Sequence, residues 1–362
     1  MIRCKPTARY RALAAACALG ASGGAAAQAL PALGADLAQT SVSGLSSGAF
    51  MATQFHVAYS GTMVGAGVVA GGPFYCAGLF APTPPATAAA TQCMQPVGDT
   101  GPDAQAALDA ARTFARDGRI DPVQNLARQR VYVFSGTRDQ TVLPRVAAQV
   151  GRFYTLGGVP ASQLQYVADV AAGHAFITSQ AGDAACAASA SPYINNCGLE
   201  QARQILQWIY GALKPAARPS GELLRFDQRA FDPGGKALLA DSGYVYVPRE
   251  CGAGGADGGA DGGADGGAAA CRVHVAFHGC LQGAGAVGER FVRGAGYLES
   301  AEANRIVVLF PQVVVSRHNP LGCWDFWGYT SDDPAQPDFF SREAPQMAAV
   351  MRMVRRLGAA PH

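Results

Sequence analysis

Apolar and polar positions follow two different periods along the chain. Short runs rich in β-branched and aromatic residues predict strands, and they alternate with longer segments that carry apolar residues at helical spacing. The predicted strands are Thr40–Ser43, Val64–Val69, Arg130–Ser135, Gln165–Val170, Tyr244–Pro248, Val273–Phe277 and Ile306–Phe310. The predicted helices are Gly48–Ser60, Asp103–Asp117, Pro144–Leu156, Leu199–Leu213 and Arg342–Leu357. This alternation predicts the α/β class, with a mostly parallel sheet and helices on both faces.

Two segments interrupt this pattern. Residues 214–220 are rich in Pro and Ala and predict a connector between two portions of one fold. Residues 252–270 repeat Ala-Asp-Gly-Gly, a low-complexity composition typical of a surface loop. The spacing of the aspartates fits neither an EF-hand nor a β-roll repeat, so we expect no metal there.

The N-terminus has the composition of an export signal. Arg3, Lys5, Arg9 and Arg11 precede an apolar run, Ala12–Leu19, and Ala27-Gln28-Ala29 supplies a cleavage site. The apolar run is too short to span a bilayer. We therefore predict a signal peptide over 1–29, a single catalytic domain over 30–362, and a secreted protein, either extracellular or periplasmic.

The chain contains 10 cysteines, of which Cys4 and Cys17 lie in the predicted signal. The other eight form an even set in an exported chain and predict four disulfides. Proximity in sequence suggests Cys76–Cys93, Cys186–Cys197, Cys251–Cys271 and Cys280–Cys323. A zinc site is disfavoured because the sequence has no C-x-x-C pair beside a histidine cluster.

Charge gives no reason to expect nucleic acid or an anionic membrane as a partner. The chain has 28 basic and 26 acidic residues, and removal of the signal would take away four of the basic ones. Neither balance makes the large single-sign patch that such partners need. We expect a monomer.

The sharpest chemical motif is Gly44-Leu45-Ser46-Ser47-Gly48, a G-x-S-x-G sequence. It follows a strand-like run and opens an amphipathic helix, which is the context of a nucleophile elbow. The two glycines allow strand and helix to approach more closely than a Cβ would permit. Ser46 is the predicted nucleophile. Ser47 occupies the wrong position in the pentapeptide for that role.

A serine nucleophile needs a base, and the base needs an acid to orient it. Asp139 follows the predicted strand that ends at Ser135, and His174 follows the strand that ends at Val170. Carboxyl ends of parallel strands meet at one edge of a sheet, so Ser46, Asp139 and His174 are expected to meet there. His56 is expected on the surface, and His274 and His278 lack the helical spacing of a zinc protease.

The order of the remaining strands is unusual. The backbone N–H of Ser47 is one expected oxyanion donor, and the second normally comes from a loop that precedes the elbow. Here the corresponding loop, at His278-Gly279, follows the elbow, after the strand Val273–Phe277. A circular permutation of a single-domain α/β-hydrolase fold explains this order.

The motifs together resemble the circularly permuted extracellular polyhydroxybutyrate (PHB) depolymerases. They are the elbow Gly44–Met51, the loops Ser135–Val142 and Gly173–Phe176, His278-Gly279-Cys280 and the aromatic segment Cys323–Tyr329. The resemblance covers most of the mature chain. It implies a serine esterase that hydrolyses poly(3-hydroxybutyrate) or its oligomers without metal or cofactor.

The resemblance also implies roles for individual residues. Ser46 would be the nucleophile, His174 the base and Asp139 its orienting acid, and the oxyanion amides would be those of Ser47 and Cys280. Trp324 or Trp327 would line the substrate crevice, although core packing is an equally good reading of either ring.

The chain departs from the family in an apparent Gly-Asp insertion, and we expect it to have no appended polymer-binding domain such as many depolymerases possess. We therefore expect activity on oligomers or amorphous polyester in place of strong activity on crystalline polymer. The alternative is a feruloyl or acetylxylan esterase, because those enzymes have similar elbows.

Overall fold

The computed structural model describes residues 27–252, 270–333 and 336–361, and eight strands form its main sheet. In spatial order these strands are β4 (Leu164–Val167), β3 (Arg130–Phe134), β2 (Met63–Val69), β1 (Asp36–Leu45), β10 (Arg272–Phe277), β11 (Ile306–Phe310), β9 (Ser242–Val247) and β8 (Glu222–Asp227). The first six run parallel, and β9 is antiparallel to both of its neighbours. The predicted α/β class with a mostly parallel sheet is confirmed.

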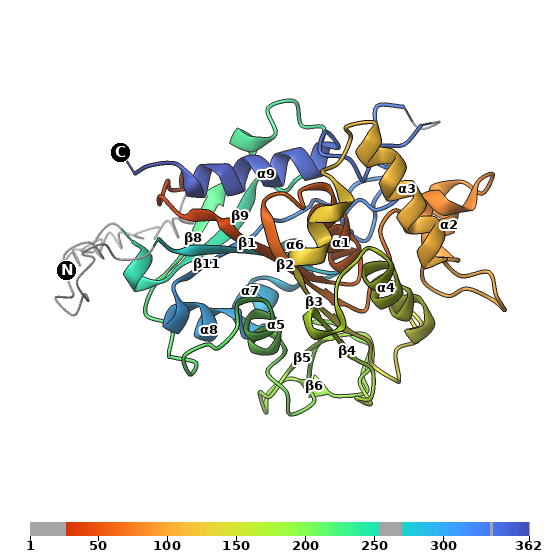
Figure 1. Cartoon of the computed structure of the whole chain (residues 1–362). Coiled ribbons are helices and arrows are strands. Elements are labelled where there is room, and N and C mark those ends of the chain that lie inside the picture. Colours follow the sequence, from red (N-terminus) through yellow and green to blue (C-terminus); the bar gives the residue numbers. More distant parts are fainter. Residues whose placement is uncertain (1–26, 253–269, 334–335, 362) are drawn as a thin grey trace, which may run out of the picture.

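Helices cover both faces of this sheet (Figure 1). On one face lie α1 (Ser47–Ala58), α3 (Ala104–Arg116), α4 (Pro144–Leu156) and α9 (Pro345–Gly358). On the other face lie α5 (Gln201–Tyr210), α7 (Arg290–Gly294) and α8 (Tyr297–Asn304). The short helices α2 (Pro85–Ala90) and α6 (Ala284–Val287) lie in connections.

The strands are buried on both sides because their alternate residues enter two different cores. In β3, Val131 and Val133 join the core under α4, whereas Tyr132 and Phe134 join the core under α5. In β11, Val307 likewise joins the core under α4, whereas Val308 joins the core under α5. A strand buried on both faces reads as a continuous apolar run, which is the pattern that predicted these strands.

The predicted elements agree with the structure to within a few residues, and the structure adds others. The sequence did not predict β8, because its exposed and half-buried residues include Glu222, Arg225 and Asp227. It also did not predict a small second sheet, made of β5 (Phe176–Thr178), β7 (Ile194–Asn196) and β6 (Ala184–Ala185). These strands are too short to leave a periodic signal. The circular permutation stays a prediction.

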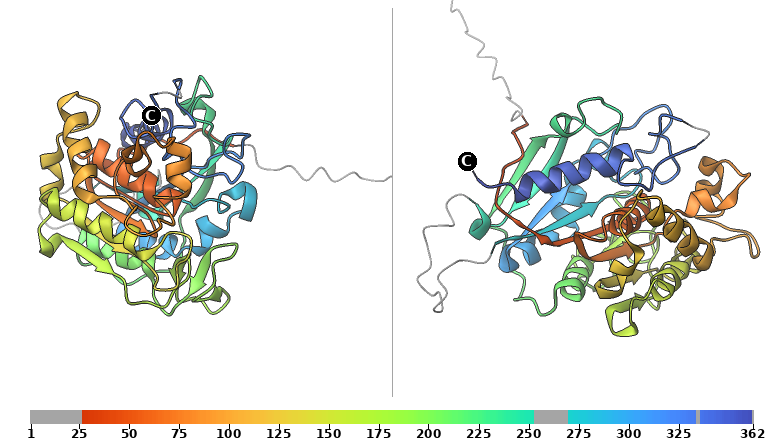
Figure 2. Two further views of the ribbon diagram at one scale, coloured as in Figure 1. Left: turned by 90° about the vertical axis from the view of Figure 1, so that its right-hand side faces the viewer. Right: turned by 45° about the horizontal axis from the view of Figure 1, so that its top comes forward.

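Segments far apart in the sequence lie side by side at the start of β1. The backbone N–H groups of Leu33 and Ala35 donate to the carbonyl oxygen of Leu357 at the end of α9, and Gly34 N–H donates to Ala359. Figures 1 and 2 show α9 lying along the sheet beside β1. Residues 1–26 of the predicted signal and residues 253–269 of the predicted loop lie outside the described residues.

All four predicted disulfides are present. They join Cys76 to Cys93, Cys186 to Cys197, Cys251 to Cys271 and Cys280 to Cys323. Within the described ranges, no helix combines the length and the apolar character needed to cross a bilayer.

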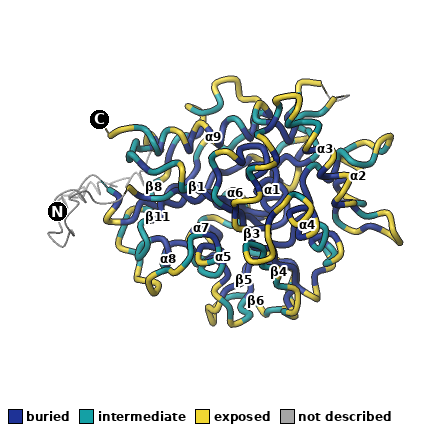
Figure 3. The backbone as a smooth tube through the Cα atoms, viewed as in Figure 1, coloured by how far each residue is buried: buried dark blue, intermediate teal, exposed yellow. Residues whose placement is uncertain are grey.

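The expectation that His56 lies on the surface is wrong. The helix α1 is buried along its whole length (Figure 3), and His56 contacts Tyr154 of α4, with Nδ1 2.9 Å from the tyrosine hydroxyl. α4 covers His56, and the segment that carries Asp325 and Phe339 covers Gln54, so the helix has no solvent-facing side that a pattern could reveal. Burial lowers the pKa of His56 to about 3.

This burial predicts a loss of stability in acid. Below pH 6.5 the unfolded chain protonates His56, but the folded chain does not until the pH approaches 3. The free energy of unfolding should therefore decrease as the pH is lowered below 6.5, by up to about 1.4 kcal/mol per pH unit for this one residue. Urea unfolding of wild type and His56→Leu between pH 7 and 5 should show a shallower slope in the variant. The exposed His318, changed to Leu, is the control and should keep the wild-type slope.

Candidate active site

Ser46 lies between the end of β1 and the start of α1 in a strained backbone conformation. Its φ is 57° and its ψ is −123°, a combination that residues other than glycine rarely adopt and that costs about 1–3 kcal/mol. Its N–H donates to Val69 on β2, and its carbonyl accepts from Ala49 and Phe50 in α1. These bonds hold the sharp turn that the sequence predicts for a nucleophile elbow.

The two glycines of the motif permit two different close approaches. A Cβ at Gly44 would lie 2.2 Å from the carbonyl oxygen of Gly48, so strand and helix meet backbone to backbone. A Cβ at Gly48 would lie 2.4 Å from the carbonyl oxygens of Phe277 and His278, at the end of β10. The second contact was not predicted. It brings the elbow helix against the loop that follows β10.

Asp139 and His174 meet as predicted. Asp139 Oδ2 lies 2.8 Å from His174 Nδ1, and Asp139 Oδ1 accepts the N–H groups of Thr141 and Val142. Asp139 is fully buried, and His174 is 4% exposed. Since a carboxylate can only accept, Nδ1 carries a proton, and the neutral tautomer with this proton holds its lone pair on Nε2, which is the form a general base requires.

Ser46 lies close to this pair and is 6% exposed. In the part of the chain that the structure describes, its hydroxyl makes no hydrogen bond to His174. Catalytic hydrogen bonds are often long without substrate and shorten when substrate binds.

The loop that carries His174 is held by a second loop, residues 186–197, which the Cys186–Cys197 disulfide closes. The His174 N–H donates to Ser189 Oγ at 2.8 Å, and the Gly173 N–H donates to the Cys186 carbonyl at 2.9 Å. A Cβ at Gly173 would lie 2.3 Å from the Ala188 carbonyl oxygen. The imidazole is thus positioned from its own backbone as well as from Asp139.

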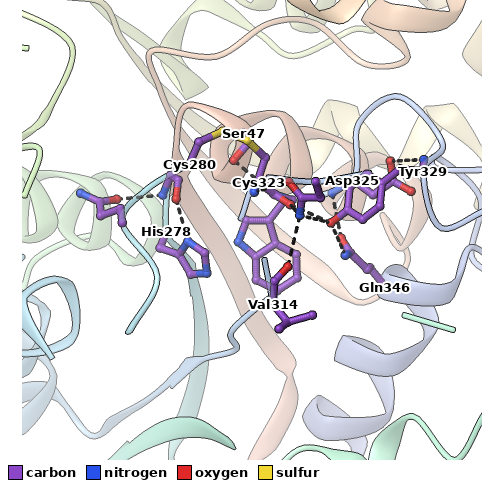
Figure 4. The surroundings of a disulfide bond; sticks show 12 residues. Ser47, His278, Cys280, Val314, Cys323, Asp325, Tyr329 and Gln346 are labelled. Carbon is purple, nitrogen blue, oxygen red and sulfur yellow. Dashed lines mark hydrogen bonds between the residues drawn. A yellow bond between two sulfur atoms is a disulfide. The ribbon is translucent and has the colours of Figure 1, made fainter. Parts of the chain in front are cut away.

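Two backbone N–H groups beside Ser46 are available to a ligand. Neither Ser47 nor Cys280 donates its N–H to any acceptor among the described residues. A Cβ at Gly279 would lie 3.4 Å from Ser46 Cβ, so the loop after β10 touches the elbow. Figure 4 shows Ser47 beside the Cys280–Cys323 disulfide, where the Trp324 N–H donates to Ser47 Oγ. Two free donors next to a serine can bind a developing oxyanion.

His278 stabilises the peptide unit that carries the Cys280 N–H. Its Nδ1 lies 2.7 Å from the Gly279 carbonyl, which belongs to the same peptide unit as the Cys280 N–H (Figure 4). The carbonyl can only accept, so Nδ1 is the donor, and the enclosed ring is neutral at pH 7 because its pKa is lowered. Burial lowers its pKa to about 4. His274 is also buried and neutral, bridging Ser41 and Ser43 of β1.

The two tryptophans differ in exposure. Trp324 is fully buried, with its ring edge-on to Phe277 at 4.8 Å between centroids. Trp327 is half-buried and contacts Phe326 and Tyr329. Of the two predicted substrate contacts, only Trp327 has surface to offer.

Sequence reasoning missed Asp325, which organises this aromatic segment. Its carboxylate accepts four backbone N–H groups, those of residues 327–330, and the Thr330 hydroxyl. Burial raises the pKa of the Asp325 carboxyl, and these bonds oppose the rise. The sequence does contain a clue to this role. An acidic residue with five aromatic or apolar neighbours is buried with them only if its carboxylate accepts hydrogen bonds.

Comparison with known proteins gives a consistent result. The chain is 41% identical over 335 residues to a poly(3-hydroxybutyrate) depolymerase of Delftia acidovorans, and the match covers 91% of this chain and 62% of that one. It is 34% identical to a polyhydroxybutyrate depolymerase of Talaromyces funiculosus, covering 92% of this chain and 93% of the relative. The chain thus spans less than two thirds of the length of the Delftia relative. No family model matches the sequence.

Two solved structures have a similar fold. The crystal structure of PHB depolymerase from Penicillium funiculosum matches with a TM-score of 0.76 and 33% identity, covering 92% of this chain and 100% of that one. A serine-to-alanine variant of a PHB depolymerase complexed with an R3HB trimer matches with the same TM-score and 32% identity, with the same two coverages.

The contact at Gly48 makes a specific prediction. In Gly48→Ala the new methyl group must displace the end of β10, so we expect the free energy of unfolding to fall by about 1–3 kcal/mol. Labelling of Ser46 by an organophosphonate should slow by a factor on the order of ten or more. Gly151→Ala in α4, where a Cβ meets open space, should leave labelling unchanged. Wild-type labelling of Gly48→Ala would contradict this account.

Proposed function

The chain belongs to the polyhydroxybutyrate depolymerase family, and from that premise we propose that it is a secreted serine esterase acting on poly(3-hydroxybutyrate) or its oligomers. The observation that carries the proposal is the buried hydrogen bond between Asp139 and His174, close to Ser46 at a strained elbow. Such an arrangement activates a hydroxyl for attack on an acyl group.

In the proposed acylation step, Nε2 of His174 removes the Ser46 hydroxyl proton while Oγ attacks the ester carbonyl carbon. The carbonyl oxygen becomes an oxyanion and accepts the N–H groups of Ser47 and Cys280. Each such donor is worth roughly 10²–10³ in rate in enzymes of this kind. The imidazolium then gives its proton to the leaving alkoxide, the hydroxyl end of the next polymer unit.

The second step releases the acyl group. A water molecule takes the place of the departed alcohol, His174 removes its proton, and the resulting hydroxide attacks the acyl-enzyme carbonyl. Collapse of this intermediate returns the proton to Ser46 Oγ and frees a hydroxybutyrate carboxyl. Asp139 stays ionised throughout and stabilises the imidazolium formed in each half-reaction. No metal or cofactor takes part in either step.

The substrate follows from the relatives. One structural relative was solved with an R3HB trimer, which supports a hydroxybutyrate oligomer as the ligand of this site. The half-buried Trp327 is the candidate for contact with the chain of the polymer. The relatives named above are polyester depolymerases, and nothing in them favours a carbohydrate ester.

Export fits the covalent structure. Four disulfides join the eight cysteines that lie in the described ranges, and disulfides persist in oxidising compartments. We accordingly place the protein outside the cytoplasm and keep the predicted signal peptide over 1–29.

Replacement of the nucleophile tests the function directly. Ser46→Ala should abolish release of 3-hydroxybutyrate oligomers from amorphous polymer, because no other hydroxyl lies in the elbow position. Circular dichroism should show the wild-type fold. Liquid chromatography of the products would identify the substrate, and release of ferulate or acetate from plant polysaccharide with no polyester products would contradict the proposal.

Replacement of the acid tests the assigned role of Asp139. In Asp139→Asn the amide donates to Nδ1, so the proton moves to Nε2 and the imidazole cannot act as a base. We expect kcat for a short chromogenic ester to fall on the order of 10³–10⁴-fold. Asp121→Asn is the matched control, since Asp121 binds Gly61 and Arg342 away from the site. Similar losses in both variants would refute the role.

A further inference from the structure

Gln282 has a buried side-chain amide whose oxygen and nitrogen both bind backbone groups. It lies two residues after Cys280 and is 1% exposed. Its Oε1 accepts the Gly279 N–H at 2.8 Å. Its Nε2 donates to the carbonyl oxygens of Pro192 at 3.1 Å and Tyr193 at 3.0 Å.

The three partners define both the residue type and its orientation. One N–H and two carbonyls require one acceptor and two donors on a single side chain, which among the uncharged side chains only an amide provides. A flipped amide would place a donor against the Gly279 N–H and an acceptor against two carbonyls. The observed orientation is therefore the one that leaves no polar group unpaired.

These bonds connect the two sides of the candidate active site. Gly279 belongs to the loop after β10 that carries the free Cys280 N–H. Pro192 and Tyr193 belong to the disulfide-closed loop 186–197, whose Ser189 accepts the His174 N–H. Gln282 thus joins the loop that offers an oxyanion donor to the loop that positions the base.

The backbone of Gly279 sets the direction of the Cys280 N–H. Glycine restricts its own backbone less than any other residue, so its two peptide units must be held by other groups. Its N–H is bound by the Gln282 side chain, and its carbonyl is bound by His278 and, at 3.3 Å, by the Gln282 N–H. External bonds fix both peptide units of Gly279, and with them the direction of the Cys280 N–H.

We propose that Gln282 is a positioning residue, which aims the Cys280 N–H at the oxyanion and keeps that donor in register with His174. The inference rests on the proposed esterase function. Since an oxyanion exists only in the transition state and the tetrahedral intermediates, the effect of Gln282 falls on kcat and leaves substrate binding alone.

The test compares two variants on a soluble short-chain 3-hydroxybutyrate ester. Gln282→Glu keeps the shape and the acceptor for Gly279 but loses both donors to loop 186–197, and Gln282→Leu loses all three bonds. We expect kcat to fall about 10- to 100-fold in each, with KM within about twofold of wild type. The affinity for a trifluoromethyl ketone, which forms an oxyanion on Ser46, should fall by the same factor as kcat/KM.

A matched control separates positioning from stability. Gln129 is also fully buried, and its Nε2 donates to the carbonyls of Ser60 and Met63, at the edge of the sheet opposite to the site. Gln129→Leu should lower the melting temperature as Gln282→Leu does, yet leave kcat unchanged.

Three results would overturn the inference. They are a kcat within twofold of wild type in either folded Gln282 variant, a loss of kcat that Gln129→Leu reproduces, and failure of both Gln282 variants to fold, which would show a structural role. Ser46→Ala keeps this test apart from that of the function itself. If Ser46→Ala remains active, the proposed esterase mechanism is wrong. If Ser46→Ala is inactive but the Gln282 variants keep the wild-type kcat, only the positioning role is wrong.

Discussion

The close approach of α1 to the carboxyl ends of β1 and β10 is the constraint on which the site depends. Helix and strands meet there through backbone atoms, because Gly44 and Gly48 leave no room for a Cβ. The turn forces Ser46 into its strained conformation, and the contact of Gly48 with the end of β10 brings the loop that carries Cys280 against the elbow. A larger separation would leave the serine without its neighbours.

The parts of the site that could be predicted are those that local sequence encodes. The elbow is a pentapeptide in a strand–turn–helix context, and Asp139 and His174 each follow a strand with a strong apolar run. Parallel strands carry such residues to one edge of the sheet, so these short motifs are enough to predict that Asp139 and His174 meet. The disulfides followed from proximity, since the four pairs lie 11 to 43 residues apart.

The parts that could not be predicted depend on partners distant in sequence. Gln282 binds carbonyls about ninety positions earlier, and no pattern around it marks them. His56 is enclosed by a helix that contributes Tyr154, ninety-eight positions later. The short strands of the second sheet exist because the disulfide-closed loop folds back on the His174 loop. In each case the position of the residue or strand depends on tertiary packing, which the local sequence pattern does not encode.

Two of the four cross-links lie in the loops that build the site. One closes the loop behind His174, and the other anchors Cys280 to the segment whose backbone reaches Ser47. The arrangement of the candidate site therefore depends on the oxidation of four thiols, and such disulfides persist in oxidising compartments. A chain with these thiols reduced would keep every motif in its sequence but would lose two covalent links that hold the loops around Ser46 and His174.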